Sequence, residues 1–230
     1  MWTLDRALVR DVAALAAASA FVGLSYGAIA VAAGLPVWFV VAMSLLVFAG
    51  GAQFIAVGLI SAGNPVAAVL AGLLLNARHL PFGLAVADVM GKGWGSRLLG
   101  SHLMVDESVA FALAQPDGTR RRRAYWLTGA TLFVAWNTGT VAGIALAGSV
   151  GDPASFGLDA AFPAGLLALL MTTLRQSRPR RVALVGASVA VLATPLLPAG
   201  LPVLLALVGL GARLTERTGR SEGHEIRQKE

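Results

Sequence analysis

The chain has 230 residues, of which 57% are hydrophobic and only 13% are charged, and its mean hydropathy is +0.73. Its formal net charge is +6 and it contains no cysteine. This composition excludes an ordinary soluble domain, disulfide bonds and thiolate metal sites, and it is typical of a helical membrane protein.

Apolar runs recur from one end of the chain to the other. Three are long enough to cross a membrane, at residues 12–33, 66–90 and 124–150. Shorter runs follow at 158–174, 182–197 and 201–212, and a weaker run at 98–114 carries charges. Two half-length runs, 37–49 and 52–62, are divided by Gly50-Gly51. We therefore expect an all-α polytopic membrane protein with about six full transmembrane helices, a re-entrant or broken helical hairpin, and a short helix that bears polar residues.

We expect residues 1–214 to form a single membrane domain and residues 215–230 to be a polar, disordered tail. A faint internal echo is present, because Phe21-Val22 followed by Gly27 recurs as Phe133-Val134 followed by Gly139. The echo indicates a weak repeat with halves at 1–115 and 120–214, as is common in transporters.

The basic residues predict the orientation. They precede the first run, follow the 66–90 run, and fill the segments 120–123, 175–181 and 213–229, whereas the loops near Leu35, Asn64 and Pro198 carry none. If 37–62 is a hairpin that enters and leaves on one side, with Gly50-Gly51 at its tip, every basic loop and both termini are cytoplasmic. The alternative is a single kinked span, which would place two basic residues outside. We favour the hairpin. The basic residues in these short loops then indicate the orientation of the protein in the membrane rather than a nucleic-acid site.

The segment Asn76-Ala77-Arg78-His79 stands inside the 66–90 apolar run. A charged side chain near the bilayer centre costs about 2.5 kcal/mol or more, so such residues usually face a bundle interior or a watery cavity and mark a function. The alternative is that Arg78 and His79 extend to the membrane edge. We favour a functional site.

Two further polar groups are candidates. Gly50-Gly51-Ala52-Gln53 would present free amides at a broken helix, although a glycine-rich packing contact would look the same. His102 and Asp106 are four residues apart and are expected on one helix face, with Glu107 beside them. The acid pair could hold a cation, a proton or a substrate ammonium, or it could lie in water at the interface.

The sequence offers little to support catalysis. Residues 23–27 fit the G-x-S-x-G pattern, but a hydrolase elbow needs a strand-turn-helix setting and these residues lie in the middle of an apolar span. The chain has no H-E-x-x-H motif, no P-loop and no Cys/His metal spacing. We expect no enzyme activity, no metal and no cofactor, with an intramembrane serine hydrolase as a remote alternative.

The pattern as a whole resembles the AzlC family, the large subunit of bacterial branched-chain amino acid exporters. The resemblance is carried by Tyr26-Gly27, by the block from Phe48 to Phe54, by Asn76-Ala77-Arg78-His79 and by Asp106-Glu107. At 80–82 the chain reads Leu-Pro-Phe where the family often reads Leu-Leu-Tyr. The resemblance implies export of Leu, Ile and Val across the inner membrane, with Met as a further candidate substrate, together with a small AzlD-like membrane subunit, and it leaves homo-oligomerisation open.

We expect a secondary transporter whose site recognises a zwitterion. Arg78 and the amides around residues 50–53 would bind the carboxylate, Asp106 or Glu107 the ammonium or a coupling proton, and Phe48 and Phe54 the apolar side chain. A channel or a structural membrane subunit is the alternative. The candidate residues for substrate binding or the transport pathway are Tyr26, Gly50, Gly51, Gln53, Phe54, Asn76, Arg78, His79, Asp106 and Glu107.

Overall fold

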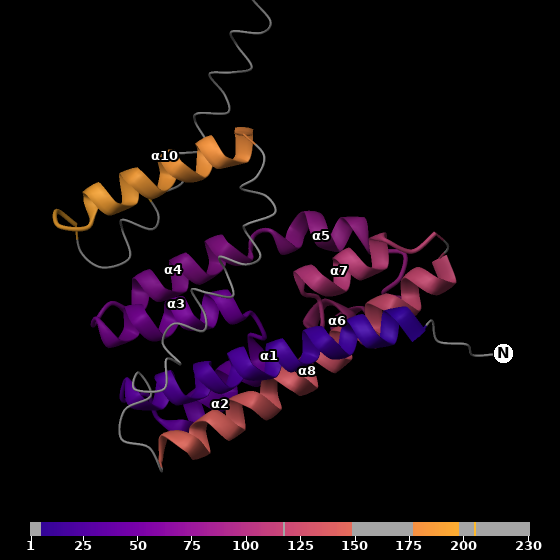
Figure 1. The fold of residues 1–230 in the computed structure, drawn as a ribbon, viewed down its shortest axis with the longest axis horizontal. Coiled ribbons are helices and arrows are strands. Elements are labelled where there is room, and N and C mark those ends of the chain that lie inside the picture. The colour runs from indigo at the N-terminus through magenta and orange to yellow at the C-terminus, as the bar shows by residue number, and fades with distance from the viewer. Residues whose placement is uncertain (1–5, 117, 149–176, 198–204, 206–230) are drawn as a thin grey trace, which may run out of the picture.

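The computed structural model describes residues 6–116, 118–148, 177–197 and 205, and this part of the chain is helical throughout, without a β-strand (Figure 1). Its helices are α1 (Arg6–Ala32), α2 (Val37–Leu46), α3 (Gly50–Ser61), α4 (Pro65–Asn76), α5 (His79–Ala85), α6 (Trp94–His102), α7 (Asp106–Leu113), α8 (Gly118–Ala147) and α10 (Ser177–Ala193). The expected spans at 158–174 and 201–212, the tail at 215–230 and part of the second repeat lie outside the described residues.

Three helical segments in the described part are long and apolar enough to cross a membrane. They are α1, the segment Pro65–Ala85 formed by α4 and α5, and α8. These segments correspond to the three full-length apolar runs, so the prediction of an all-helical membrane fold is confirmed at this level. The shorter apolar helices α2 and α3 are each too short to span alone.

Helices α1 and α8 lie along each other and form the spine of the described structure (Figure 1). Glycines bring the two backbones into direct contact: a Cβ at Gly23 or Gly27 would overlap a carbonyl oxygen of α8, and a Cβ at Gly139 or Gly143 would overlap one of α1. This is the small-xxx-small packing by which membrane helices approach closely.

The contacts between α1 and α8 are reciprocal. Gly23 faces the carbonyl of Trp136, and Gly139 faces that of Ala20. Gly23 and Gly139 are therefore equivalent positions in the two helices, as are Ala20 and Trp136, and the same shift in residue number relates both pairs. The numbers rise together, so the helices are parallel. The same shift relates Gly27 to Gly143, and it is larger by one helical turn than the shift of the Phe-Val echo in the sequence. The internal repeat itself stays a prediction.

The expected break between the two half-length runs is present, but it does not fall at the two glycines. The chain turns at residues 47–49, where Phe48 has a φ of 39°, and Gly50 already begins α3. The Gln53 amide on α3 donates to the Met43 carbonyl on α2 at 2.7 Å, which ties the two helices together beside the turn. The prediction that Gly50-Gly51 forms the tip is therefore wrong.

Gly50 has a different role from the predicted one. A Cβ there would lie 2.7 Å from the end of the Trp136 indole, so a larger residue would have to displace that ring from the first turn of α3. The glycine thus serves close approach between helices rather than a turn.

A tight turn joins α3 to α4. Gly63 takes a φ of 77°, and the amides of Gly63 and Asn64 donate back to Ile60 and Leu59, which ends α3 in a Schellman motif. The Asn64 side chain then accepts a hydrogen bond from the Ala67 amide at 3.1 Å and caps α4, with Pro65 in its first turn. Small residues let the two helices pack closely, namely Ala56, Ala67, Ala68 and Ala71.

Asn64→Ala should lower the stability of this turn by about 1 kcal/mol, because the Ala67 amide loses its capping partner. We expect a fall of about 2–4 °C in the thermal unfolding midpoint of the purified protein in detergent. Ser61→Ala, on an exposed position of the same turn, is the matched control and should leave the midpoint unchanged. Equal midpoints for Asn64→Ala and wild type would contradict the capping role.

The 66–90 apolar run is interrupted between α4 and α5. Helical hydrogen bonding falters at residues 77–78 because Pro81 has no amide proton to offer the Ala77 carbonyl and its ring crowds that oxygen. The Ala77 carbonyl is instead met by the Leu80 amide in a tighter turn, at 3.1 Å. The polar block Asn76–His79 therefore sits at a break in a membrane segment.

The 98–114 run is also two helices, α6 and α7, separated by residues 103–105. At the start of α7, the Ser108 hydroxyl accepts a hydrogen bond from the Val105 amide and donates one to the Val105 carbonyl. His102 ends α6 and Asp106 begins α7, so these two residues do not share a helix face as we predicted. The spacing rule failed because it assumes an unbroken helix, and no Gly or Pro stands at this break.

Candidate functional site

The three interruptions at 47–49, 77–78 and 103–105 meet in space, and we call the place where they meet the junction. Phe48 and His102 are ring neighbours at 6.4 Å, and both contact Phe133 of α8, at 5.0 and 5.5 Å. Arg78 reaches Asp106 at 2.8 Å. Phe133 lies halfway along α8, so the junction is at mid-depth of the α1–α8 pair.

The order of contacts along α8 shows how two hairpins approach the junction from opposite ends. Near the start of α8, Tyr125 donates to the Gly100 carbonyl of α6 at 2.8 Å, and Leu103 then packs on Gly129 one turn further on. From the other end, Ser44 of α2 donates to Asn137 at 2.7 Å. The α6–α7 tip and the α2–α3 tip therefore point toward each other and meet at Phe133.

The charged pair of the junction is Arg78 and Asp106. Their N–O distance is 2.8 Å, and their side chains are 41% and 43% exposed in the described structure. Glu107 is half-buried next to the pair. The structure thus brings together the arginine and the acid pair that the sequence singled out separately. Arg78 and Asp106 contact each other directly, with no space for a substrate between them.

Two side-chain oxygens near the junction accept no hydrogen bond from any residue in the described part of the chain. They are Gln53 Oε1 and Asn76 Oδ1, both buried, from the adjoining helices α3 and α4. An orphaned buried acceptor is unfavourable by about 1–3 kcal/mol unless a ligand or water supplies a donor. Two such acceptors in neighbouring helices are suited to a group rich in N–H donors, such as an ammonium.

The His79 ring lies 3.0 Å from the Asn76 backbone carbonyl through Nδ1, which ties it across the break between α4 and α5. It also contacts Phe82 edge-on at a ring distance of 6.2 Å. His79 therefore holds the local geometry of the polar block, next to Arg78.

Helix ends add partial charges of both signs. The first amides of α3 have no intrahelical acceptor, and residue 49 offers them no capping side chain, so this end carries partial positive charge. The α4 C-terminus carries partial negative charge, and Leu75 in its last turn lies next to Gly51, 3.0 Å from where a Cβ would be. Opposite helix ends therefore adjoin at the junction.

An aromatic cluster covers one side of the junction. Tyr26 stacks on Trp136 at 5.9 Å and meets Phe54 edge-on at 5.6 Å, and Phe54 meets Trp136 at 6.5 Å. Tyr26 is only 1% exposed, so it is part of the core in this structure. The sequence predicted Tyr26 and Phe54 but missed Trp136 and Phe133, because an aromatic residue in an apolar span gives no polarity signal. Gly50 signalled a close approach between helices, but not which residue approaches it.

Among the described residues, no group of three or more His, Asp or Glu side chains could hold a metal ion. Ser25 of the G-x-S-x-G pattern is buried within α1, and the described part of the chain holds no strand-turn-helix element that could present it as a nucleophile. Interrupted helices in a membrane fold, with ionisable side chains at the breaks, are typical of integral membrane proteins that move solutes.

Comparison with known proteins gives the family. The family model "AzlC protein" matches residues 14–150, more than half of the chain, and the chain therefore belongs to the AzlC family. The branched-chain amino acid transport protein AzlC of Bacillus subtilis (strain 168) is 28% identical over 200 residues, covering 83% of this chain and 77% of that protein. These matches support a role in membrane transport.

A second relative is an uncharacterized membrane protein of Haemophilus influenzae (strain ATCC 51907 / DSM 11121 / KW20 / Rd). It is 33% identical over 72 residues, which cover 31% of this chain and 30% of that protein. No solved structure matches the chain.

Proposed function

We propose that this protein is a secondary transporter that exports branched-chain amino acids across the bacterial inner membrane and binds them at the junction. The observation that carries the proposal is the meeting of three helix interruptions around an Arg–Asp pair halfway along α8. The name of the Bacillus subtilis relative supports the substrate class.

The chemistry of the junction fits a zwitterion. A substrate carboxylate would replace Asp106 on the Arg78 guanidinium, with the α3 amides adding positive partial charge. The substrate ammonium would take the place of Arg78 beside Asp106 and could donate to Gln53 Oε1 and Asn76 Oδ1. A zwitterion inserted in this way exchanges one ion pair for two, so no charge is left without a partner.

The aromatic cluster provides the third point of recognition. In the chain, Phe48 precedes the first turn of α3 and Phe54 follows it, and their rings would receive a branched aliphatic side chain. An apolar wall of this kind distinguishes branched aliphatic side chains from polar ones more strongly than it distinguishes Leu from Val.

The arrangement of basic residues supports an orientation with the start of α1 in the cytoplasm. Arg6 and Arg10 lie in the first turns of α1, and residues 120–123 lie in the first turns of the parallel helix α8. The loops at 33–36 and 62–64, which follow α1 and α3, carry no basic residue. We propose that α2–α3 is a re-entrant hairpin entered from outside, and that a small AzlD-like subunit completes the transporter.

A channel or a structural subunit remains the second candidate class, because orphaned buried acceptors could also serve a water-filled path. The two classes differ in kinetics, since a carrier that binds its substrate saturates and selects the L-isomer, whereas a pore does neither.

The test is efflux of preloaded labelled L-valine and L-leucine from cells that lack their native exporters. We expect efflux that saturates, prefers the L-isomers, and requires both this chain and the small subunit. Efflux without saturation would favour the channel. No efflux, with both proteins verified in the membrane, would overturn the assignment to branched-chain amino acids.

A further inference from the structure

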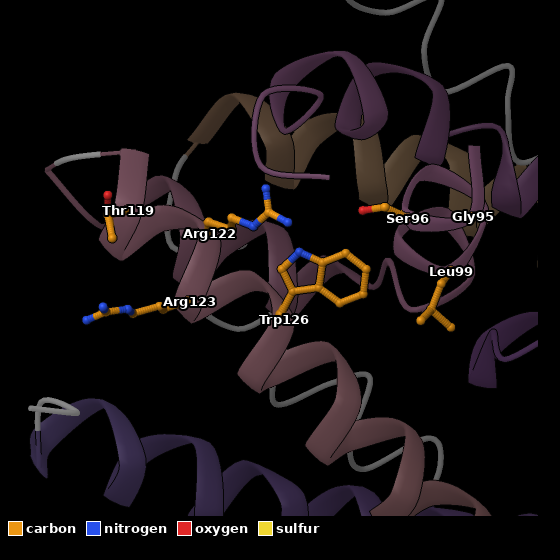
Figure 2. A pocket seen from close by; sticks show the side chains of 7 residues that line it. All are labelled: Gly95, Ser96, Leu99, Thr119, Arg122, Arg123 and Trp126. Atoms are coloured by element: carbon orange, nitrogen blue, oxygen red, sulfur yellow. The ribbon is translucent and has the colours of Figure 1, made fainter. Parts of the chain in front are cut away.

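A pocket of about 620 Å³ lies away from the junction, between the first turns of α6 and α8. Figure 2 shows Arg122 and Trp126 of α8 directed toward Ser96 and Leu99 on the α6 side, with Arg123 projecting from the other side of α8. The complete lining is Gly95, Ser96, Leu99, Thr119, Arg122, Arg123 and Trp126. The pocket therefore combines the Arg122 guanidinium with hydroxyls and apolar walls.

The Arg122 guanidinium is not neutralised within the described part of the chain. The neighbouring Arg121 is paired with Asp88 at 3.2 Å and also donates to the Ala85 carbonyl. Arg122 makes no ion pair with any described residue and is exposed at the pocket. An unpaired guanidinium presents a planar array of N–H donors that matches two oxygens of a phosphate.

Other polar groups of the pocket are partly committed already. The Ser96 hydroxyl donates to the Met90 carbonyl, and the Trp126 indole donates to the Val89 carbonyl at 3.1 Å. These bonds fix the position of both side chains. They leave the Ser96 oxygen able to accept a hydrogen bond, the Thr119 hydroxyl able to donate, and the Trp126 ring face available for apolar contact.

The apolar walls decide which kind of anion fits. Leu99 is 54% exposed, and together with the Trp126 ring it forms an apolar wall of this cationic pocket. The pocket also lies at the end of the α1–α8 pair where arginines gather, which is the level of the lipid headgroups in a membrane. A free phosphate would use the guanidinium but would leave the apolar walls in contact with water.

We propose that this pocket binds the headgroup of an anionic phospholipid, with its phosphate on Arg122 and the upper part of an acyl chain along Leu99 and Trp126. Basic pockets between membrane helices are suited to anionic lipids by both charge and shape. The site is separate from the junction, so it does not depend on which solute the protein transports.

The test is native mass spectrometry of the full-length protein in detergent, titrated with dioleoyl phosphatidylglycerol or dioleoyl phosphatidylcholine. We expect phosphatidylglycerol to bind more tightly. Arg122→Ala should weaken its binding about fivefold, from about 1 kcal/mol per basic residue. Arg10→Ala removes the same charge from a position outside the pocket and should have little effect.

Equal binding of the two lipids would overturn the proposal, as would equal losses in Arg122→Ala and Arg10→Ala. A further arm uses inorganic phosphate on lipid-free protein. Phosphate binding that depends on Arg122 and matches the affinity for phosphatidylglycerol would assign the pocket to a free anion and reject the lipid. Circular dichroism of each variant should be unchanged, since Arg122 is exposed at a helix start.

Discussion

Arg78→Ala should reduce valine efflux at least tenfold while the protein still reaches the membrane. The guanidinium forms the 2.8 Å contact with Asp106 and, in the proposed binding mode, holds the substrate carboxylate. A hydrogen bond between charged groups is about twice as strong as a neutral one, so its loss should weaken substrate binding by about tenfold or more. The measurement is the concentration dependence of efflux in cells with matched protein levels.

Two variants separate substrate binding from a structural ion pair. Exchanging the partners, with Arg78→Asp and Asp106→Arg together, restores the pair and would restore efflux if the pair only holds α4–α5 against α7. If the two groups bind opposite ends of the substrate, the exchange inverts the charges and efflux stays low. Arg121→Ala breaks an Arg–Asp pair of 3.2 Å outside the junction and should leave efflux near the wild-type value. Wild-type efflux in Arg78→Ala would reject the role of this residue.

Gly139→Leu should strongly destabilise the protein. A side chain at this position would overlap the backbone carbonyl of Ala20, so α1 and α8 would have to move apart along their whole contact. Overpacking usually costs about 1–3 kcal/mol, and an overlap with rigid backbone falls at or above the upper end. We expect the thermal unfolding midpoint to fall by about 10 °C, or the protein to fail to accumulate.

The reciprocal packing of α1 and α8 gives this prediction an internal check. Gly23→Leu meets the Trp136 carbonyl in the equivalent position and should be as damaging as Gly139→Leu. Gly58→Leu is the matched control, because a Cβ at Gly58 has open space around it. Equal midpoints for Gly139→Leu and Gly58→Leu, measured in the same detergent, would contradict the close crossing.

The long elements of the fold were predictable because they depend on local composition. An apolar run of membrane length specifies a helix almost regardless of its neighbours, and α1, α4–α5 and α8 follow the runs closely. The interruptions were harder to place. At Pro81 the cause of the break is chemical and visible, whereas Phe48 adopts a φ of 39° where its ring contacts Phe133 and His102, neighbours that are distant in the sequence. Only tertiary packing explains that turn.

The members of the site were predictable, but their arrangement was not. Polarity within apolar runs singled out Arg78 and Asp106 separately. Their contact joins positions 28 residues apart, across a break between α6 and α7 that has no sequence marker. Trp136 was missed because its indole is one apolar side chain among many, and its importance appears only when Gly50 is seen to lie against it.

If branched-chain amino acids bind where the three interruptions meet, bound substrate should protect a single cysteine placed there from chemical modification. The natural chain has no cysteine, so Ala77→Cys places one reactive thiol in the break beside Arg78, at an exposed position. Ala62→Cys, exposed at the far end of α3, is the matched control. We expect L-valine, and not D-valine, to slow modification of Ala77→Cys by a water-soluble maleimide while Ala62→Cys is unaffected. Unchanged modification of Ala77→Cys at saturating L-valine, in protein that still transports it, would contradict the account.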